Sequence, residues 1–256
     1  MRSWIAFLKK EMLEQARTGK LMFLGILFVL FGIMNPAVAK LTPWLLEMFA
    51  DSLEGSGMTI TAVTITALDS WVQFYKNIPM ALIAFVLLQG GIFTKEYASG
   101  TLVLSLTKGL ARFKVVIAKT AVLLILWTVG YWMCFGITYA YNAYFWDNTI
   151  AKSLMLSAVC WWLFGIFVIA LMILFSTLFQ TNAGVLLGSG GVVLVCAVIG
   201  MIPKCSKYLP TFLMDGNSLI YGLSEPKTYL ASMVITAATA LLCFAVSVPL
   251  FNQKQL

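Results

Sequence analysis

The sequence predicts an all-α integral membrane protein with six transmembrane helices, an interfacial amphipathic helix at its start and a short cytoplasmic helix between the second and third spans. The composition is 61% apolar and only 11% charged, with a mean hydropathy of +0.93. Soluble domains carry about 25% charged residues. So few charges cannot cover a water-exposed surface, so we expect most of the outer face to contact lipid.

The first nineteen residues predict a basic amphipathic helix. Trp4 and Leu8 belong to an apolar series at helical spacing, and Lys9 and Lys10 lie on the remaining circumference. Such a helix should lie in the plane of the inner membrane surface as an interfacial elbow. It is either a simple topogenic anchor or an elbow that frames a site for a cytoplasmic partner.

Six apolar stretches are long enough to cross about 30 Å of hydrocarbon as helices. They form one transmembrane domain over residues 1–256, with spans at about 21–39, 78–94, 115–139, 154–178, 183–202 and 229–251. The segment 40–77 is then a large outer loop, and residues 203–228 form an outer segment that dips back toward lipid.

Basic residues set the orientation. With an even number of spans both termini share one side, and the segments on that side hold eleven Lys and Arg, against six on the other. The positive-inside rule therefore predicts a multi-pass cell-membrane protein with both termini in the cytoplasm. The net charge of +7 is explained by this topology, so no nucleic-acid partner is expected.

The sequence lacks the residues of most catalytic and metal sites. It has no histidine and no Cys-x-x-Cys pair, and the predicted spans hold no Asp or Glu and only Lys119, near an inner end, as a basic residue. We therefore expect no metal site and no catalytic residue. An intramembrane enzyme and a proton-coupled antiporter are both disfavoured.

The inner loop between the second and third spans is the most informative segment. Ser99 or Thr101 can cap a short helix, Leu104 can anchor it at the membrane, and Lys108-Gly109 can end it. A short helix between two spans can act as a lever on both. The alternative is an ordinary interfacial loop whose basic residues serve the positive-inside rule.

This loop resembles that of ABC exporter permeases of the type 2 class. The resemblance rests on Glu96-x-x-x-Gly100-Thr101-Leu102, the leucines that follow, Ala111-Arg112-Phe113-Lys114 and Lys119, although Ala111 and Gly109 depart from the usual Ser and Pro. It implies a coupling helix around Ser99–Lys108 that docks on a cytoplasmic ATPase, with Glu96 and Arg112 flanking it and available for ion pairs with the partner or the elbow. The implied coupling residues are Glu96, Ser99, Gly100, Thr101, Leu104, Thr107, Lys108 and Arg112.

The resemblance also implies the partners. The chain has no Gly-x-x-x-x-Gly-Lys-Ser/Thr phosphate loop, so ATP and Mg²⁺ are expected on separate ABC ATPase subunits and no cofactor on this chain. A second permease chain, identical or related, would complete the path for a hydrophobic or amphipathic peptide, lipid or drug. The short loops resemble those of bacterial systems for antimicrobial peptide resistance. The alternative function is a channel or scaffold subunit not driven by ATP.

Overall fold

The computed structural model describes residues 2–54, 64–102, 107 and 111–254, and these residues are nearly all helical, with no strand among them. Six helices are long and apolar enough to cross a membrane, which confirms the predicted fold class. The long helices are α1 (Arg2–Arg17), α2 (Lys20–Glu54), α3 (Ala67–Gln89), α6 (Arg112–Phe145), α7 (Leu154–Leu178), α8 (Asn182–Gly200) and α11 (Pro226–Gln253). The short ones are α4 (Thr94–Ser99), η1 (Asn148–Ile150), α9 (Pro203–Ser206), η2 (Pro210–Met214) and α10 (Gly216–Ile220).

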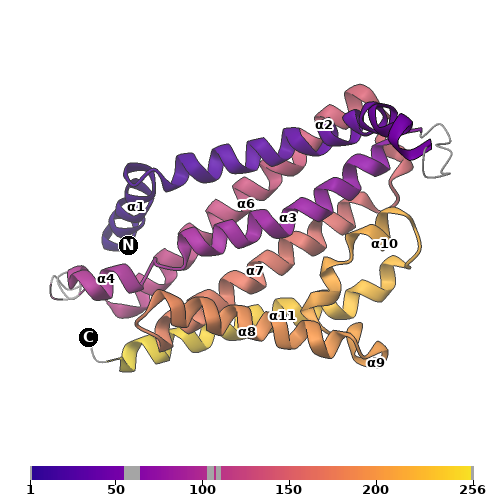
Figure 1. The fold of residues 1–256 in the computed structure, drawn as a ribbon. Helices are drawn as coiled ribbons and strands as arrows, with labels where there is room; N and C mark the ends of the chain where they lie inside the picture. Colours follow the sequence, from indigo (N-terminus) through magenta and orange to yellow (C-terminus); the bar gives the residue numbers. More distant parts are fainter. Residues whose placement is uncertain (1, 55–63, 103–106, 108–110, 255–256) are drawn as a thin grey trace.

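The helix α7 runs through the middle of the bundle, between α6 and α11, with α8 on its side (Figure 1). Its residues are apolar around the whole circumference, as expected for a helix surrounded by other helices. Gly165 of α7 lets the indole of Trp127 from α6 come close, because a Cβ at this position would lie 2.2 Å from that ring. The core is therefore built around large aromatic side chains that pack on small residues.

Two helices extend well beyond the predicted spans. The helix α2 continues past Ala39 to Glu54, and α3 begins at Ala67 instead of at residue 78. Most of the segment predicted as an outer loop over 40–77 is therefore helical in its described part. The apolar stretch marks only the part of a helix that fits within hydrocarbon, whereas the helix itself can continue into the interface and water.

The segment after α8, predicted as an outer one, folds back against the bundle. Its side chains Leu213, Leu219 and Ile220 are buried. The carbonyl of Met214 accepts a hydrogen bond from the indole of Trp161 at 2.9 Å, and the carbonyl of Leu209 accepts one from the hydroxyl of Ser232 at 2.6 Å. The segment thus contacts α7 and α11 through its backbone as well as through its apolar side chains.

Both ends of the chain lie at the same end of the bundle, together with α4 (Figure 1). This arrangement follows from six crossings. That the shared end is the cytoplasmic one remains a prediction from the distribution of Lys and Arg.

Candidate functional site

A buried group of charges joins three segments at the end of the bundle where the termini lie. Lys119 of α6, only 1% exposed, places its ammonium 2.8 Å from Glu11 Oε2 of α1 and 3.0 Å from Glu96 Oε2 of α4. The same ammonium donates a hydrogen bond to the carbonyl of Ile92 at 3.0 Å. Lys119 is therefore the central cation of what we call the charge junction.

Lys10 of α1 completes the charge junction from the exposed side. Its ammonium lies 2.7 Å from Glu96 Oε1 and 3.1 Å from Glu11 Oε1, so that two lysines alternate with two carboxylates. Burial alone would lower the pKa of Lys10, but the hydrogen bond to Glu96 and the charge of Glu11 outweigh it and raise this pKa well above its ordinary value. Lys10 is thus held in its charged form.

The charge junction forms because polar residues of α1 recur on the side that faces the bundle. Glu11 and Gln15 are one turn apart and follow the buried Phe7 at the same spacing. Gln15 accepts a hydrogen bond from the amide of Gln89, at the end of α3, at 3.0 Å. The helix α1 is therefore joined by polar contacts to α3, α4 and α6.

The carboxylates of this region do not form a convincing metal site. Oxygens of Glu11, Glu14 and Glu96 lie within 4.8 Å of one another. However, Lys10 and Lys119 already occupy the space between them, with Lys10 also 3.4 Å from Glu14. The positive charges that would repel a cation are in place, and the arrangement is that of an ion-pair network.

A second set of contacts joins α4 and the start of α6 to the C-terminal end of α11. The guanidinium of Arg112 donates hydrogen bonds to the carbonyls of Asn252 at 3.0 Å and Lys254 at 2.6 Å. Lys254 in turn donates to the carbonyl of Thr177 at 2.9 Å, and its ammonium lies 4.3 Å from the ring centre of Tyr97. Basic groups therefore satisfy free carbonyls at the ends of α7 and α11, where the helix dipoles favour positive charge.

Burial accompanies these contacts of Lys254. Desolvation lowers the pKa of its ammonium below the ordinary value for lysine. Tyr97, half-buried at the end of α4, donates its hydroxyl proton to the carbonyl of Ser176 at 3.1 Å. Both ends of the inner loop are thus fixed, one at Glu96 and the other at Arg112.

The structure assigns the predicted coupling residues different places. Glu96 is buried, Arg112 is half-buried, and Ser99, Gly100, Thr101 and Thr107 are exposed. Leu104 and Lys108 lie outside the described residues. Glu96 forms ion pairs with the elbow and with α6. The resemblance had implied an ion pair either with the elbow or with the partner ATPase.

The predicted start of the coupling helix needs a correction at Ser99. Ser99 is the last residue of α4, and its hydroxyl lies 2.8 Å from that of Thr101. Gly100 has φ 67, a left-handed conformation that ends α4, and helical structure resumes at Thr101–Leu102. Ser99 therefore ends one helix instead of starting the next, because Gly100 provides a left-handed exit directly after it. The exit expected at Gly109 lies outside the described residues.

The four predicted elbow residues also differ in their surroundings. Trp4 and Leu8 are half-buried against the core, and Lys9 is exposed. Lys10 belongs to the charge junction. Sequence reasoning missed Glu11, Gln15 and the role of Lys119, although an acidic residue on the bundle side of a basic helix and a single lysine inside a span were both visible signals.

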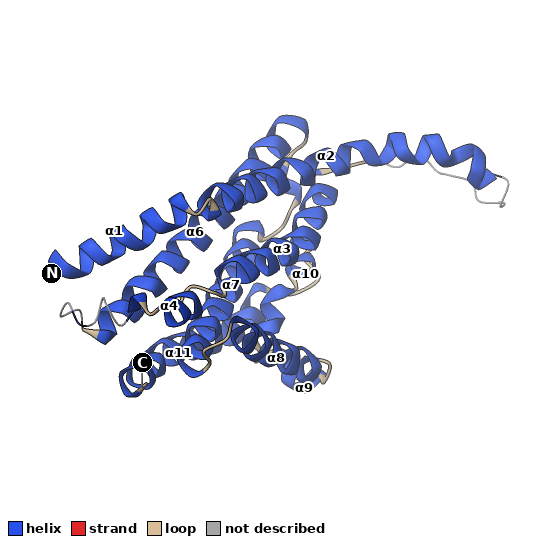
Figure 2. Cartoon of the chain, turned by 60° about the vertical axis from the view of Figure 1, so that its left-hand side comes forward, coloured by secondary structure: helices blue, strands red, loops and turns tan. Residues whose placement is uncertain are grey.

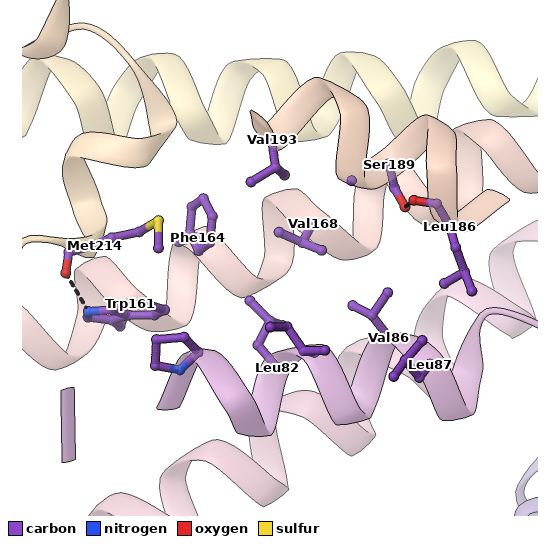
Figure 3. Close-up of a pocket in the computed structure, with 13 residues that line it drawn as sticks. Leu82, Val86, Leu87, Trp161, Phe164, Val168, Leu186, Ser189, Val193 and Met214 are labelled. Atoms are coloured by element: carbon purple, nitrogen blue, oxygen red, sulfur yellow. Dashed lines mark hydrogen bonds between the residues drawn. The ribbon is translucent and has the colours of Figure 1, made fainter. Parts of the chain in front are cut away.

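An apolar groove lies on the side of the bundle between α3, α7 and α8 (Figure 3). Its volume is about 310 Å³. The walls are formed by Leu82, Val86, Leu87, Phe164, Val168, Leu186 and Val193, among others. Polar groups in the walls are already hydrogen-bonded: Ser189 to the carbonyl of Val185 at 2.8 Å, and the Trp161 indole to Met214. The groove therefore suits an apolar occupant.

Comparison with known proteins decides the family. Residues 5–209 match the family described as ABC-2 family transporter protein. The chain belongs to this ABC-2 transporter family. It is also similar to the uncharacterized transmembrane protein YxlG of Bacillus subtilis (strain 168), with 21% identity over 212 residues, which cover 82% of this chain and 81% of the relative. No solved structure matches the chain.

Membership of the ABC-2 family gives the chain a role as the transmembrane component of a membrane transporter. The six apolar helices agree with this role. They also make it a multi-pass membrane protein, and the transmembrane component of the family is not itself catalytic.

Proposed function

We propose that this ABC-2 chain is the permease subunit of an ATP-driven exporter, powered by a separate cytoplasmic ATPase that pushes on the loop between α4 and α6. The observation that carries the proposal is the double pairing of Glu96, which lies 2.7 Å from Lys10 and 3.0 Å from Lys119. A force applied to the loop reaches α1 and α6 directly through this carboxylate.

The loop is fixed at both ends, which is what a lever requires. On one side of the loop, Tyr97 of α4 is hydrogen-bonded to the end of α7. On the other side, Arg112 at the start of α6 is hydrogen-bonded to the end of α11. A displacement of the loop therefore changes the positions of four spans together, including α3, which precedes α4. Between the fixed ends, Ser99, Gly100, Thr101 and Thr107 are exposed and accessible to a partner.

The energy source must be another polypeptide under this proposal, because the sequence contains no phosphate-loop motif. ATP and Mg²⁺ would bind to that ATPase, and two permease chains would form the path between them. The cytoplasmic location of both termini and the cell membrane of a bacterium are part of the same proposal.

The apolar groove supports a hydrophobic or amphipathic cargo. Its walls offer aliphatic and aromatic side chains, and the polar groups among them are hydrogen-bonded within the protein. A lipid, a drug or an amphipathic antimicrobial peptide could bury its apolar part there, whereas a charged solute would find no partner in this groove.

The test is purification of the tagged chain from its native membrane in a gentle detergent, followed by an ATPase assay of the eluate. Thr101→Arg places a charge on the exposed loop and is expected to lower recovery of the ATPase. Glu96→Gln leaves the exposed loop surface unchanged and is expected to retain the ATPase but to weaken the dependence of its activity on cargo. Lys204→Ala, an exposed residue at the opposite end of the bundle, is the matched control.

Absence of any associated nucleotide-binding protein, under conditions that preserve other membrane complexes, would refute the proposal and favour a channel or scaffold subunit. Equal ATPase recovery and equal cargo dependence in all three variants would refute the role of the loop.

A further inference from the structure

The outer part of α2 presents an apolar surface beyond the other spans. Exposed apolar residues follow one another at intervals of three or four from Met22 to Met48, which places them in a single stripe. They are Met22, Ile26, Leu30, Ile33, Ala37, Leu41, Trp44 and Met48. The first half of this stripe lies on a membrane-spanning helix, and the second half follows it on the same face past the exposed Lys40.

The stripe is too long to lie within hydrocarbon along the membrane normal. From Met22 to Met48 the helix rises about 39 Å at about 1.5 Å per residue, whereas the hydrocarbon core is about 30 Å thick. Either the last turns project into water, or the helix bends and follows the membrane surface.

The structure shows a bend. Beyond its middle, α2 turns away from the bundle and projects to one side (Figure 2), and the same part is seen nearly end-on in Figure 1, where the spans run across the picture. Pro36 and Pro43 lie in this helix, and a proline inside a helix removes a backbone hydrogen bond and favours a kink. The hydroxyl of Thr42 donates to the carbonyl of Val38 at 2.8 Å next to the second proline.

A contact with α6 fixes the level at which the projecting part begins. The ammonium of Lys40 lies 3.7 Å from the ring centre of Phe145, the last residue of α6. The residues after Lys40 therefore begin beside the last residue of a neighbouring helix, and Lys40 itself lies about 30 Å along α2 from Lys20, about the thickness of the hydrocarbon core. A helix that leaves the bundle sideways at this level runs along the boundary.

We infer that the outer part of α2, from Leu41 to Met48, lies in the membrane–water interface at the end of the bundle away from the termini, with Leu41, Trp44 and Met48 inserted among the lipid acyl chains. Trp44 is 55% exposed and Met48 58% exposed in the isolated chain. Tryptophan prefers this boundary because its ring is apolar and its N–H is polar, and buried apolar area is what holds such a helix at the surface.

The inference is tested with the full chain in phospholipid vesicles, carrying the photoreactive residue p-benzoylphenylalanine at position 44 and, in a second variant, at position 48. After irradiation, mass spectrometry measures the fraction of chains that carry a covalent phospholipid. Position 26, in the middle of the same stripe, is the reference for lipid contact, and position 225, an exposed polar residue before α11, is the control for water.

The expected result is a lipid-adduct fraction at positions 44 and 48 within about threefold of that at position 26 and roughly tenfold above that at position 225, as for a helix whose apolar face reaches the acyl chains. Cross-links between two copies of the chain in place of lipid adducts would overturn the inference, because the stripe would then be a protein interface. Adduct fractions as low as that at position 225 would overturn it as well, since the helix would then project into water.

Discussion

Lys119 is a buried cation that contacts two carboxylates, and its replacement by methionine tests the charge junction directly. Methionine keeps most of the volume and the unbranched shape of the side chain but removes the charge. Glu11 and Glu96 would then lie close together with Lys10, 45% exposed in its side chain, as their remaining cationic partner. Breaking a buried ion pair by removal of one partner typically costs about 3–5 kcal/mol, so we expect Lys119→Met to lower the free energy of unfolding by about this amount.

The assay is thermal unfolding of the detergent-solubilised chain, followed by circular dichroism or by the loss of monodisperse protein. Lys9→Met is the matched control, because Lys9 is exposed on α1 and belongs to no ion pair that the described residues form. The double variant Lys119→Met with Glu11→Gln should recover part of the loss, since it removes one uncompensated negative charge. Equal unfolding temperatures for Lys119→Met and Lys9→Met would refute the reasoning.

Three further substitutions test the packing and the anchoring contacts. Gly165→Ala should destabilise the bundle by about 1–3 kcal/mol because its Cβ would clash with Trp127, whereas Gly136→Ala, with open space around it, should be neutral or stabilising in the same unfolding assay. Trp161→Phe keeps an aromatic ring but loses the hydrogen bond to the outer segment; we expect a loss of about 1 kcal/mol and faster limited proteolysis between α8 and α11, and unchanged proteolysis would contradict the role of this bond. Arg112→Gln should free the end of α11, seen as faster amide hydrogen exchange there, and exchange equal to that of the wild type would count against this role.

The number of spans was predictable because hydrocarbon imposes a minimum length on every apolar stretch. The ends of α2 and α3 were not, because the same rule does not act on the parts of a helix outside the hydrocarbon. The apolar composition around α7 likewise gives no periodicity from which its neighbours could be read.

The candidate site was predictable in part. The resemblance to ABC exporter permeases pointed to Glu96 and Arg112 on either side of the coupling helix, and both make contacts that fix the loop. The partners of Glu96 were harder to find, because Lys119 and Glu11 are 108 positions apart and only the folded arrangement of α1 on α6 brings them together. Helical spacing predicted that α1 lies in the plane of the membrane surface, whereas Glu11 and Gln15 are buried against the bundle.

The segment before α11 is held through its backbone as well as through its buried side chains. Side chains of α7 and α11 donate hydrogen bonds to four of its carbonyl oxygens, those of Leu209, Met214, Asp215 and Gly216. Since these oxygens are present whatever amino acid occupies the positions, related chains could vary the exposed residues of the segment while the donors stay the same and the path of the chain is kept. Variation among relatives should therefore be greater in the exposed part of this segment than at the donors Ser157, Trp161, Tyr229 and Ser232.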